Sequence, residues 1–389
     1  MKLFERTSKG SHKVFFGLLA ACMITTVTVS TNQGLGLFVA NPLACIFAVC
    51  MATFTAVPIF FLIWLLDRNE PEPLSFLLGG FAWGAFVATS ISILFNEAFA
   101  SVMTVLVEAE AASVLTAIFS APFIEEITKG AAILFLFVLY RYEFDNILDG
   151  IIYGAVIGLG FAWFENIMYY MKPFLDQDPQ TGLNDMLELI YMRGLVSASG
   201  GSHATYTALT GLGVGIARQR RNGFLRFIVI LIGLGLAMFA HFIWNAGAGM
   251  LMSFFDAGKD QILYGTPLAT IVLQFPFLMI LLFTTAWMWS YEAKIIDAQL
   301  KTESSQIITK KERESLTPTL SRSLRNFISL FSGKWAEWQH RYRLRRLWIQ
   351  LAFCKWHHHE DIDSDWPADQ DKNIVTLREE IKQQRRLSS

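Results

Sequence analysis

Long apolar runs constrain the fold of this chain more than any other feature of its sequence. A helix needs about 20 apolar residues to cross the hydrocarbon core of a bilayer. Eight runs approach or exceed that length, at 14–31, 43–66, 74–97, 113–141, 151–171, 193–217, 226–252 and 264–291. We interpret the first as a span rather than a signal peptide, because no small-residue cleavage pattern closes it. The sequence therefore predicts an all-α, polytopic bundle of about eight transmembrane helices.

Composition narrows the class of protein further. Hydrophobic residues make up 53% of the chain and charged residues only 17%, whereas a soluble domain carries about 25% charged residues. The formal net charge of −1 provides no basic field for nucleic acid, so we expect no nucleic-acid partner. The four cysteines form no CxxC pair, which argues against a disulfide framework or a zinc knuckle.

The charged residues divide the chain and orient it in the membrane. Residues 292–389 hold 18 Lys or Arg and 14 Asp or Glu, so we expect a membrane domain at 1–291 followed by a charged tail. Loops on the N-terminal side of the spans hold ten Lys or Arg and the opposite loops hold three, a bias that places both termini in the cytoplasm. The largest outer loop, about 172–192, is acidic.

Within the tail, residues of about 321–356 mix Arg and Lys with Leu, Phe and Trp. This pattern is typical of a basic amphipathic helix that lies on the inner leaflet of the membrane. A soluble helix packed on the cytoplasmic loops would show the same pattern, and the sequence leaves both interpretations open.

Ionisable side chains interrupt four consecutive spans. They are Glu125, Glu126, Lys129, Glu165, His203 and His241. Each costs about 2.5–3.5 kcal/mol at the centre of a membrane helix, so these groups must face one another or a wet cavity. They lie at a similar depth, nearer the outer boundary, when the spans are measured at 1.5 Å per residue. The alternative is a polar network that only holds helices together, but two adjacent carboxylates and two histidines exceed what packing requires.

This set of side chains is suited to activating water. Carboxylates and histidines can hold a divalent metal with an open position for water, and a glutamate can act as a general base. Asn245 lies one helical turn after His241 and can donate to a developing oxyanion. The HExxH motif of site-2-type metalloproteases and the GxGD motif of aspartyl intramembrane proteases are absent. The short G-x-S at 200–202, which a rhomboid-type serine protease would use with a histidine such as His241, leaves the glutamates unexplained. A proton-coupled secondary transporter also keeps Glu and His at mid-depth, although no internal repeat is visible.

An ordered series of short motifs resembles the PrsW family of membrane proteases, which is related to the CAAX-processing and bacteriocin-immunity (CPBP-type) proteases. The matches cover about residues 60–250 and are, in order, Asp67 to Pro73, EExxK at Glu125 to Lys129, Phe144-Asp145, Leu148-Asp149-Gly150, FxxxEN at Phe161 to Asn166, His203 with Thr207 to Thr210, and HxxxN at His241 to Asn245. We interpret the first of these as a turn at the membrane edge and Asp149 as a helix N-cap.

The resemblance implies an intramembrane endopeptidase of a bacterial cytoplasmic membrane, acting on membrane-anchored proteins such as anti-sigma factors. By the same resemblance, Glu125 and Glu126 would be the catalytic pair and Asn245 would support an oxyanion. Glu165, His203 and His241 would form the water-activating or metal-binding shell, with Zn²⁺ as the expected ion if a metal is used. The CPBP-type relatives carry FxxxH where this chain has Glu165, so an identical ligand set is not implied.

The two adjacent carboxylates are expected to play different roles. Glu125 precedes Lys129 by four residues and shares a helix face with it, so we expect Lys129 to hold Glu125 ionised. Glu126 lies about 100° further round the helix and is the expected general base for water.

Overall fold

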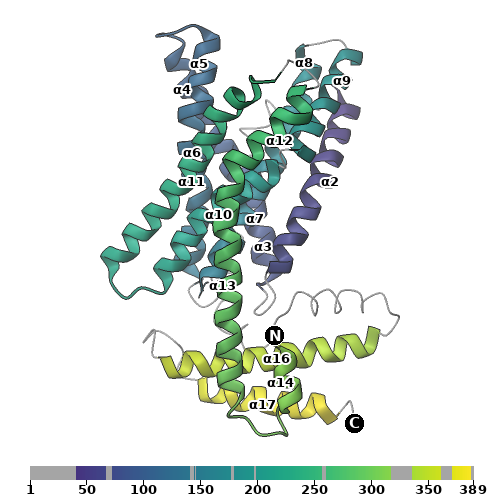
Figure 1. Ribbon diagram of the computed structural model, residues 1–389, viewed down its shortest axis with the longest axis vertical. Helices are drawn as coiled ribbons and strands as arrows, with labels where there is room; N and C mark the ends of the chain where they lie inside the picture. The colour runs from purple at the N-terminus through teal and green to yellow at the C-terminus, as the bar shows by residue number, and fades with distance from the viewer. Residues whose placement is uncertain are drawn as a thin grey trace. The chain divides into compact units, whose positions relative to one another are not determined.

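The computed structural model describes residues 41–66, 72–140, 144, 146–176, 179–196, 199–255, 260–316, 335–360 and 370–386. Every regular element in these residues is a helix (Figure 1). This confirms the predicted all-α, polytopic class. The span expected at 14–31 lies outside the described residues.

Helices occupy the seven predicted apolar runs from 43–66 onward, and further helices lie outside those runs. The first group is α2 (Pro42–Leu66), α3 (Leu74–Ala82), the π-helix η2 (Trp83–Ala88), α4 (Thr89–Met103), α5 (Ala109–Leu115), η3 (Thr116–Ser120) and α6 (Ala121–Leu139). The second group is α7 (Ile147–Met171), α8 (Pro173–Asp176), α9 (Pro179–Leu189), η4 (Ile190–Val196), α10 (Ser199–Arg218) and α11 (Gly223–Met252). The third group is η5 (Gln261–Gly265), α12 (Thr266–Ala269), η6 (Thr270–Gln274), α13 (Phe275–Leu300), α14 (Lys310–Leu316), α16 (Trp335–Glu360) and α17 (Gln370–Arg386).

Five of the described helices are long and apolar enough to cross a membrane. They are Pro42–Leu66, Leu74–Met103, Ile147–Met171, Gly223–Met252 and Gln261–Leu300. The runs at 113–141 and 193–217 are also helical in the described residues, but their helices α6 and α10 carry charged and polar side chains. One expectation needs correction: much of the segment read as an outer loop, about 172–192, is helical, because α8 and α9 lie within it.

Helix α7 is the centre of the bundle and packs most closely on α10. Glycines allow this approach: a Cβ atom added at Gly158 would lie 2.1 Å from the carbonyl oxygen of His203, and one at Gly211 would lie 1.9 Å from that of Gly150. A larger residue at either position would force the helices apart. The close packing therefore fixes the height of His203 against α7.

A capping box starts α7 at Ile147, four residues earlier than the apolar run suggests. The side chain of Asn146 accepts hydrogen bonds from the backbone N–H groups of Leu148 and Asp149, and the Asp149 carboxylate accepts from Asn146 N–H. The N-cap is therefore Asn146 rather than Asp149, which supplies the return bond of the box.

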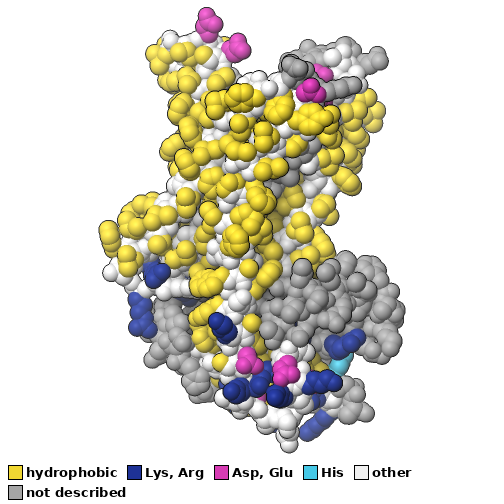
Figure 2. Space-filling view, in the orientation of Figure 1, with side chains coloured by type: hydrophobic (Ala, Val, Ile, Leu, Met, Phe, Trp, Pro, Cys, Tyr) yellow, Lys and Arg dark blue, Asp and Glu magenta, His cyan; other side chains and the backbone are white. Residues whose placement is uncertain are grey.

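The described residues divide into two compact units. The membrane unit comprises residues 41–66 and 72–282, and the C-terminal unit comprises residues 283–386. Hydrophobic side chains cover most of the visible face over α11 and the first part of α13 (Figure 2). Exposed large residues on these helices include Phe224, Phe239 and Phe275, as expected for helices in contact with lipid.

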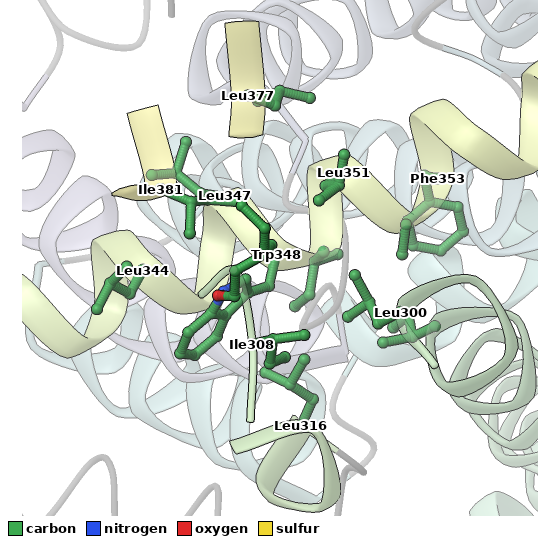
Figure 3. Close-up of a cluster of buried hydrophobic side chains, with 14 of the residues drawn as sticks. Leu300, Ile308, Leu316, Leu344, Leu347, Trp348, Leu351, Phe353, Leu377 and Ile381 are labelled. Carbon is green, nitrogen blue, oxygen red and sulfur yellow. The ribbon is translucent and has the colours of Figure 1, made fainter. Parts of the chain in front are cut away.

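The C-terminal unit has a hydrophobic core of its own. Leu344, Leu347, Trp348 and Leu351 line one side of α16 and are buried together with residues from the end of α13, from α14 and from α17 (Figure 3). The Trp348 indole donates a hydrogen bond to the Ile307 carbonyl oxygen (2.8 Å). The described part of the predicted amphipathic helix thus packs its apolar side chains inside this unit. Its contact with a lipid surface and the cytoplasmic location of the unit stay predictions.

Candidate active site

Helix α6 carries two buried carboxylates and a buried lysine within five residues. Glu125, Glu126 and Lys129 are each at most 6% exposed. Lys129 Nζ donates to Glu126 Oε1 at 2.6 Å and lies 3.7 Å from Glu125 Oε2. The lysine therefore pairs most closely with Glu126, its i−3 neighbour, rather than with Glu125.

Glu126 is saturated with hydrogen bonds. Besides Lys129, the Thr207 hydroxyl donates to Glu126 Oε2 (3.2 Å), and His241 Nδ1 lies 3.1 Å from Glu126 Oε1. A carboxylate held by three donors is fixed in place as an acceptor. Glu126 is therefore the closest charge partner of Lys129, where Glu125 was expected, and which of the two glutamates acts on water stays a prediction.

Glu125 has the opposite environment. Its Oε2 atom is buried and makes no hydrogen bond with any of the described residues, and His241 Nε2 lies 4.0 Å away. Glu125 also lines the cavity described below, whereas Glu126 does not. A buried acceptor that makes no hydrogen bond is costly, and the Lys129 ammonium group at 3.7 Å compensates only its charge.

His203 and Glu165 extend the cluster onto α10 and α7. His203 Nδ1 lies 3.2 Å from Lys129 Nζ, and His203 Nε2 lies 2.8 Å from Glu165 Oε2. An ammonium group can only donate, so Nδ1 accepts from Lys129 and the proton of the imidazole sits on Nε2, where it is donated to Glu165.

Aromatic contacts fix the orientation of the two imidazoles. The rings of His203 and His241 lie 5.1 Å apart and nearly perpendicular, and Tyr206 stacks on His241 at the same distance. The ammonium group of Lys129 lies 4.3 Å from the centre of the Phe161 ring. The polar groups expected to share one depth are therefore brought together from α6, α7, α10 and α11.

A cavity of about 680 Å³ reaches this cluster. Glu125, Glu165, His203, His241 and Asn245 all line it. Small and polar residues of α4, α5 and η3 also line it, among them Thr89, Ser92, Asn96, Ser113 and Thr116. The approach to the cluster is therefore lined by both polar and apolar side chains.

Asn245 lies on α11, one turn beyond His241. Its Nδ2 atom donates a hydrogen bond to the Ala117 carbonyl oxygen (2.7 Å). Because an amide nitrogen has two hydrogens, this bond orients the side chain and leaves one N–H for another acceptor in the cavity. Its catalytic role, like those of the other five residues, stays a prediction.

The grouping that suits a metal ion differs from the expected one. Glu125, His203 and His241 each offer one ligand atom, and these three atoms lie within 4.8 Å of one another. The resemblance in sequence implied Glu165 in place of Glu125. One carboxylate and two imidazoles are a donor set that Zn²⁺ accepts. Glu125 Oε2, which makes no hydrogen bond with the described residues, fits that use. His241 Nε2 fits it too, since a carboxylate on the other ring nitrogen is typical of zinc histidines. His203 would have to release one of its two hydrogen bonds.

Sequence reasoning missed Arg193 as a member of the site. Arg193 lies on η4, lines the cavity and pairs with Glu165 at 3.1 Å. It was counted as a charge of the outer loop. Its position at the very start of the apolar run 193–217 was the available signal, but an arginine at the end of a span can also extend to the membrane interface, so the position alone does not predict a carboxylate partner.

Comparison with known proteins places this arrangement in a family. A family model described as "PrsW family intramembrane metalloprotease" matches residues 72–282, which is more than half of the chain. The chain belongs to the PrsW family. The matched range holds every residue of the cluster, so the family assignment and the site rest on the same part of the molecule.

Curated relatives carry the same family name. The chain is 32% identical over 155 residues to a protein named Protease PrsW from Geobacillus kaustophilus. The aligned segment covers 40% of this chain and 60% of the relative. The chain is 28% identical over 155 residues to Protease PrsW from Bacillus subtilis, covering 40% of this chain and 62% of the relative. The matches thus span less than two thirds of these relatives. No solved structure matches the chain. None of the matches favours the transporter alternative.

Proposed function

We propose that this chain is an intramembrane endopeptidase that hydrolyses a peptide bond in or near the span of a membrane-anchored protein. The observation that carries the proposal is the environment of Glu125, whose buried Oε2 atom makes no hydrogen bond with the described residues, in a side chain that lines a cavity beside two imidazoles. Membership of the PrsW family supports the same reaction class. We further propose a bacterial cytoplasmic membrane, both termini in the cytoplasm, and regulators such as anti-sigma factors as substrates.

The residues of the cluster divide the work of hydrolysis. A water molecule in the cavity donates a hydrogen bond to Glu125 Oε2, which takes its proton as the oxygen attacks the scissile carbonyl carbon. Lys129 pairs with Glu126 at 2.6 Å and lies 3.7 Å from Glu125 Oε2, so the ammonium group is held mainly by Glu126 and compensates the charge of Glu125 at longer range. The free N–H of Asn245 donates to the oxyanion that develops on the carbonyl.

The same residues suit a metal-assisted version of the reaction. Glu125, His203 and His241 would hold the ion, and a bound Zn²⁺ would lower the pKa of a coordinated water. Glu126 would then hold the His241 ring through Nδ1 and leave Nε2 free. Glu125 is required in both versions, so its removal tests the proposal whether or not a metal takes part.

The test is hydrolysis of a single-span substrate by the reconstituted protein and by Glu125→Gln. We expect the substitution to lower the rate by about 10²–10⁴, the usual cost of a missing general base, while expression and thermal stability stay near those of the wild type. Mass spectrometry of the products should place the cut in the outer half of the substrate's span or just outside it. Glu303→Gln, a matched change in the C-terminal unit, should keep full catalytic activity. Undiminished cleavage by Glu125→Gln would refute the proposal.

A further inference from the structure

Arg193 forms three contacts with one face of α7 at the edge of the cavity. Its Nη2 atom donates to Glu165 Oε2 (3.1 Å), its Nε atom donates to Asn166 Oδ1 (3.2 Å), and its guanidinium lies 3.7 Å from the centre of the Tyr169 ring. The three partners lie within five residues of α7, whereas Arg193 comes from η4. The guanidinium is thus held in a single orientation by a charge, an amide and an aromatic face.

The contact with Glu165 connects Arg193 to His203. The same oxygen, Glu165 Oε2, receives Arg193 Nη2 and lies 2.8 Å from His203 Nε2. Glu165 is less buried than Glu125 and Glu126, so packing alone does not hold its carboxylate toward the imidazole. Removing the guanidinium would let that carboxylate turn into the cavity and away from His203.

We propose that Arg193 is a positioning residue for His203 that acts through Glu165. It holds Glu165 Oε2 as the acceptor of the His203 Nε2 proton, which keeps His203 Nδ1 as the acceptor from Lys129. This inference deepens the function proposed above and rests on it for its kinetic consequence. It concerns the tautomer and ring orientation of His203, which exist whether or not the protein is a protease.

The chemistry of arginine explains why a lysine would not serve equally well. Arg193 uses two different nitrogens for Glu165 and Asn166 and lays its flat face on Tyr169. A lysine ammonium is a point charge that can pair with Glu165 but cannot make the fork or the stacked contact. Arg193→Lys should therefore still hold the Glu165 carboxylate toward His203 in part, and Arg193→Gln should not hold it.

The test combines kinetics with a spectroscopic measurement on the metal-free protein. Arg193→Gln should lower kcat by about 10–100-fold, the usual cost of removing a residue that orients a catalytic histidine, with KM changed less than about threefold and Arg193→Lys in between. ¹⁵N NMR of histidine-labelled protein, assigned with His203→Gln, should show His203 protonated on Nε2 in the wild type. In Arg193→Gln it should show a mixture of tautomers.

Arg218→Gln is the matched control, because Arg218 is buried on α10 and donates its Nε to the Phe144 carbonyl oxygen (3.0 Å). It should lower stability and leave the His203 signal unchanged. A His203 signal in Arg193→Gln identical to that of the wild type would overturn the inference. An increase in KM with kcat unchanged would also overturn it, because Arg193 would then be a substrate-binding residue. If the wild type and Glu125→Gln are equally inactive, the proposed function fails, but the NMR result still decides the role of Arg193.

Discussion

The described residues contain two clusters of buried charge, one in each unit, and they differ in how completely the charged groups are hydrogen-bonded. In the C-terminal unit, Glu303 Oε1 receives Lys355 Nζ (2.6 Å) and Arg378 Nη2 (2.7 Å), and Glu303 Oε2 receives Arg378 Nε (3.0 Å). Lys355 also donates to the Gln299 carbonyl oxygen and to the Thr302 hydroxyl, both at 2.7 Å. Every charged group of this cluster has found its acceptor or donor.

The cluster on α6 is built from the same kinds of residue but leaves one position open. Glu126 and Lys129 pair at 2.6 Å, while Glu125 Oε2 makes no hydrogen bond with the described residues, lies 3.7 Å from Lys129 Nζ and belongs to a side chain that lines the cavity. A fully hydrogen-bonded network rigidifies the structure around it, whereas a buried carboxylate that makes no hydrogen bond and lines a cavity is a candidate for function. We therefore propose that Glu303 and Glu126 hold the fold and that Glu125 is the carboxylate used for chemistry.

The sharpest test of this distinction is to replace each of the two adjacent glutamates of α6 with glutamine in a separate variant. Glu126→Gln leaves the ammonium group of Lys129 buried without its closest counter-charge, a change that typically costs about 3–5 kcal/mol of stability. Glu125→Gln removes no hydrogen bond and only the longer, 3.7 Å ion pair with Lys129, so it should lower stability much less. Thermal unfolding of the two variants in detergent measures the difference. Equal destabilisation by both substitutions would break the assignment of roles.

The next test concerns the metal. If Glu125, His203 and His241 hold an ion, the purified wild type should bind about one equivalent of Zn²⁺ and lose it to a chelator, and Glu125→Gln should weaken binding more than Glu165→Gln. Elemental analysis and calorimetric titration measure both. Glu303→Gln, in the cluster whose groups are all paired, should bind as the wild type does. Stronger loss in Glu165→Gln would restore the ligand set suggested by the sequence.

The comparison also shows what the sequence could and could not predict. Equal depth on consecutive spans was enough to group Glu125, Glu165, His203 and His241, because a charge inside a membrane must find a partner. The partner of Lys129 was not predictable, since residues three and four positions away both lie on its face. Contacts from other helices decide it, through Thr207 and His241 on Glu126.

The C-terminal unit shows the same limit. The spacing of Leu344, Leu347, Trp348 and Leu351 indicates one buried face on α16, but a periodic pattern does not reveal what covers that face. In the structure, residues from the end of α13, from α14 and from α17 cover it. Arg193 was missed for a related reason, because its partners Glu165 and Asn166 lie 28 and 27 residues away.

The smallest expected effect is a dependence of the C-terminal unit on pH, and it follows from the same satisfied network. Burial alone would raise the pKa of Glu303, but hydrogen bonds from Arg378 and Lys355 outweigh it and lower the pKa below its usual value near 4.5. The pKa of Glu312 is also lowered, because hydrogen bonds from Thr309 and Arg385 outweigh the effect of burial. A carboxylate with a lowered folded-state pKa contributes stability above its unfolded pKa and loses it as pH falls through the folded value.

The C-terminal unit should therefore be equally stable from neutral pH down to about 4.5 and lose stability progressively below it. Hydrogen exchange of peptides from α16 and α17, corrected for intrinsic exchange at each pH, measures the opening free energy. Glu303→Gln should lower that free energy at pH 7 and flatten its fall in acid, leaving the slope due to Glu312. Glu314→Gln is the matched control, because Glu314 is exposed on α14 and its ion pair with Lys310 is long, at 4.0 Å. In this variant the opening free energy should fall with pH as steeply as in the wild type. An unchanged slope in Glu303→Gln would show that the paired cluster does not stabilise its unit through charge, and the contrast with the open cluster on α6 would then rest on geometry alone.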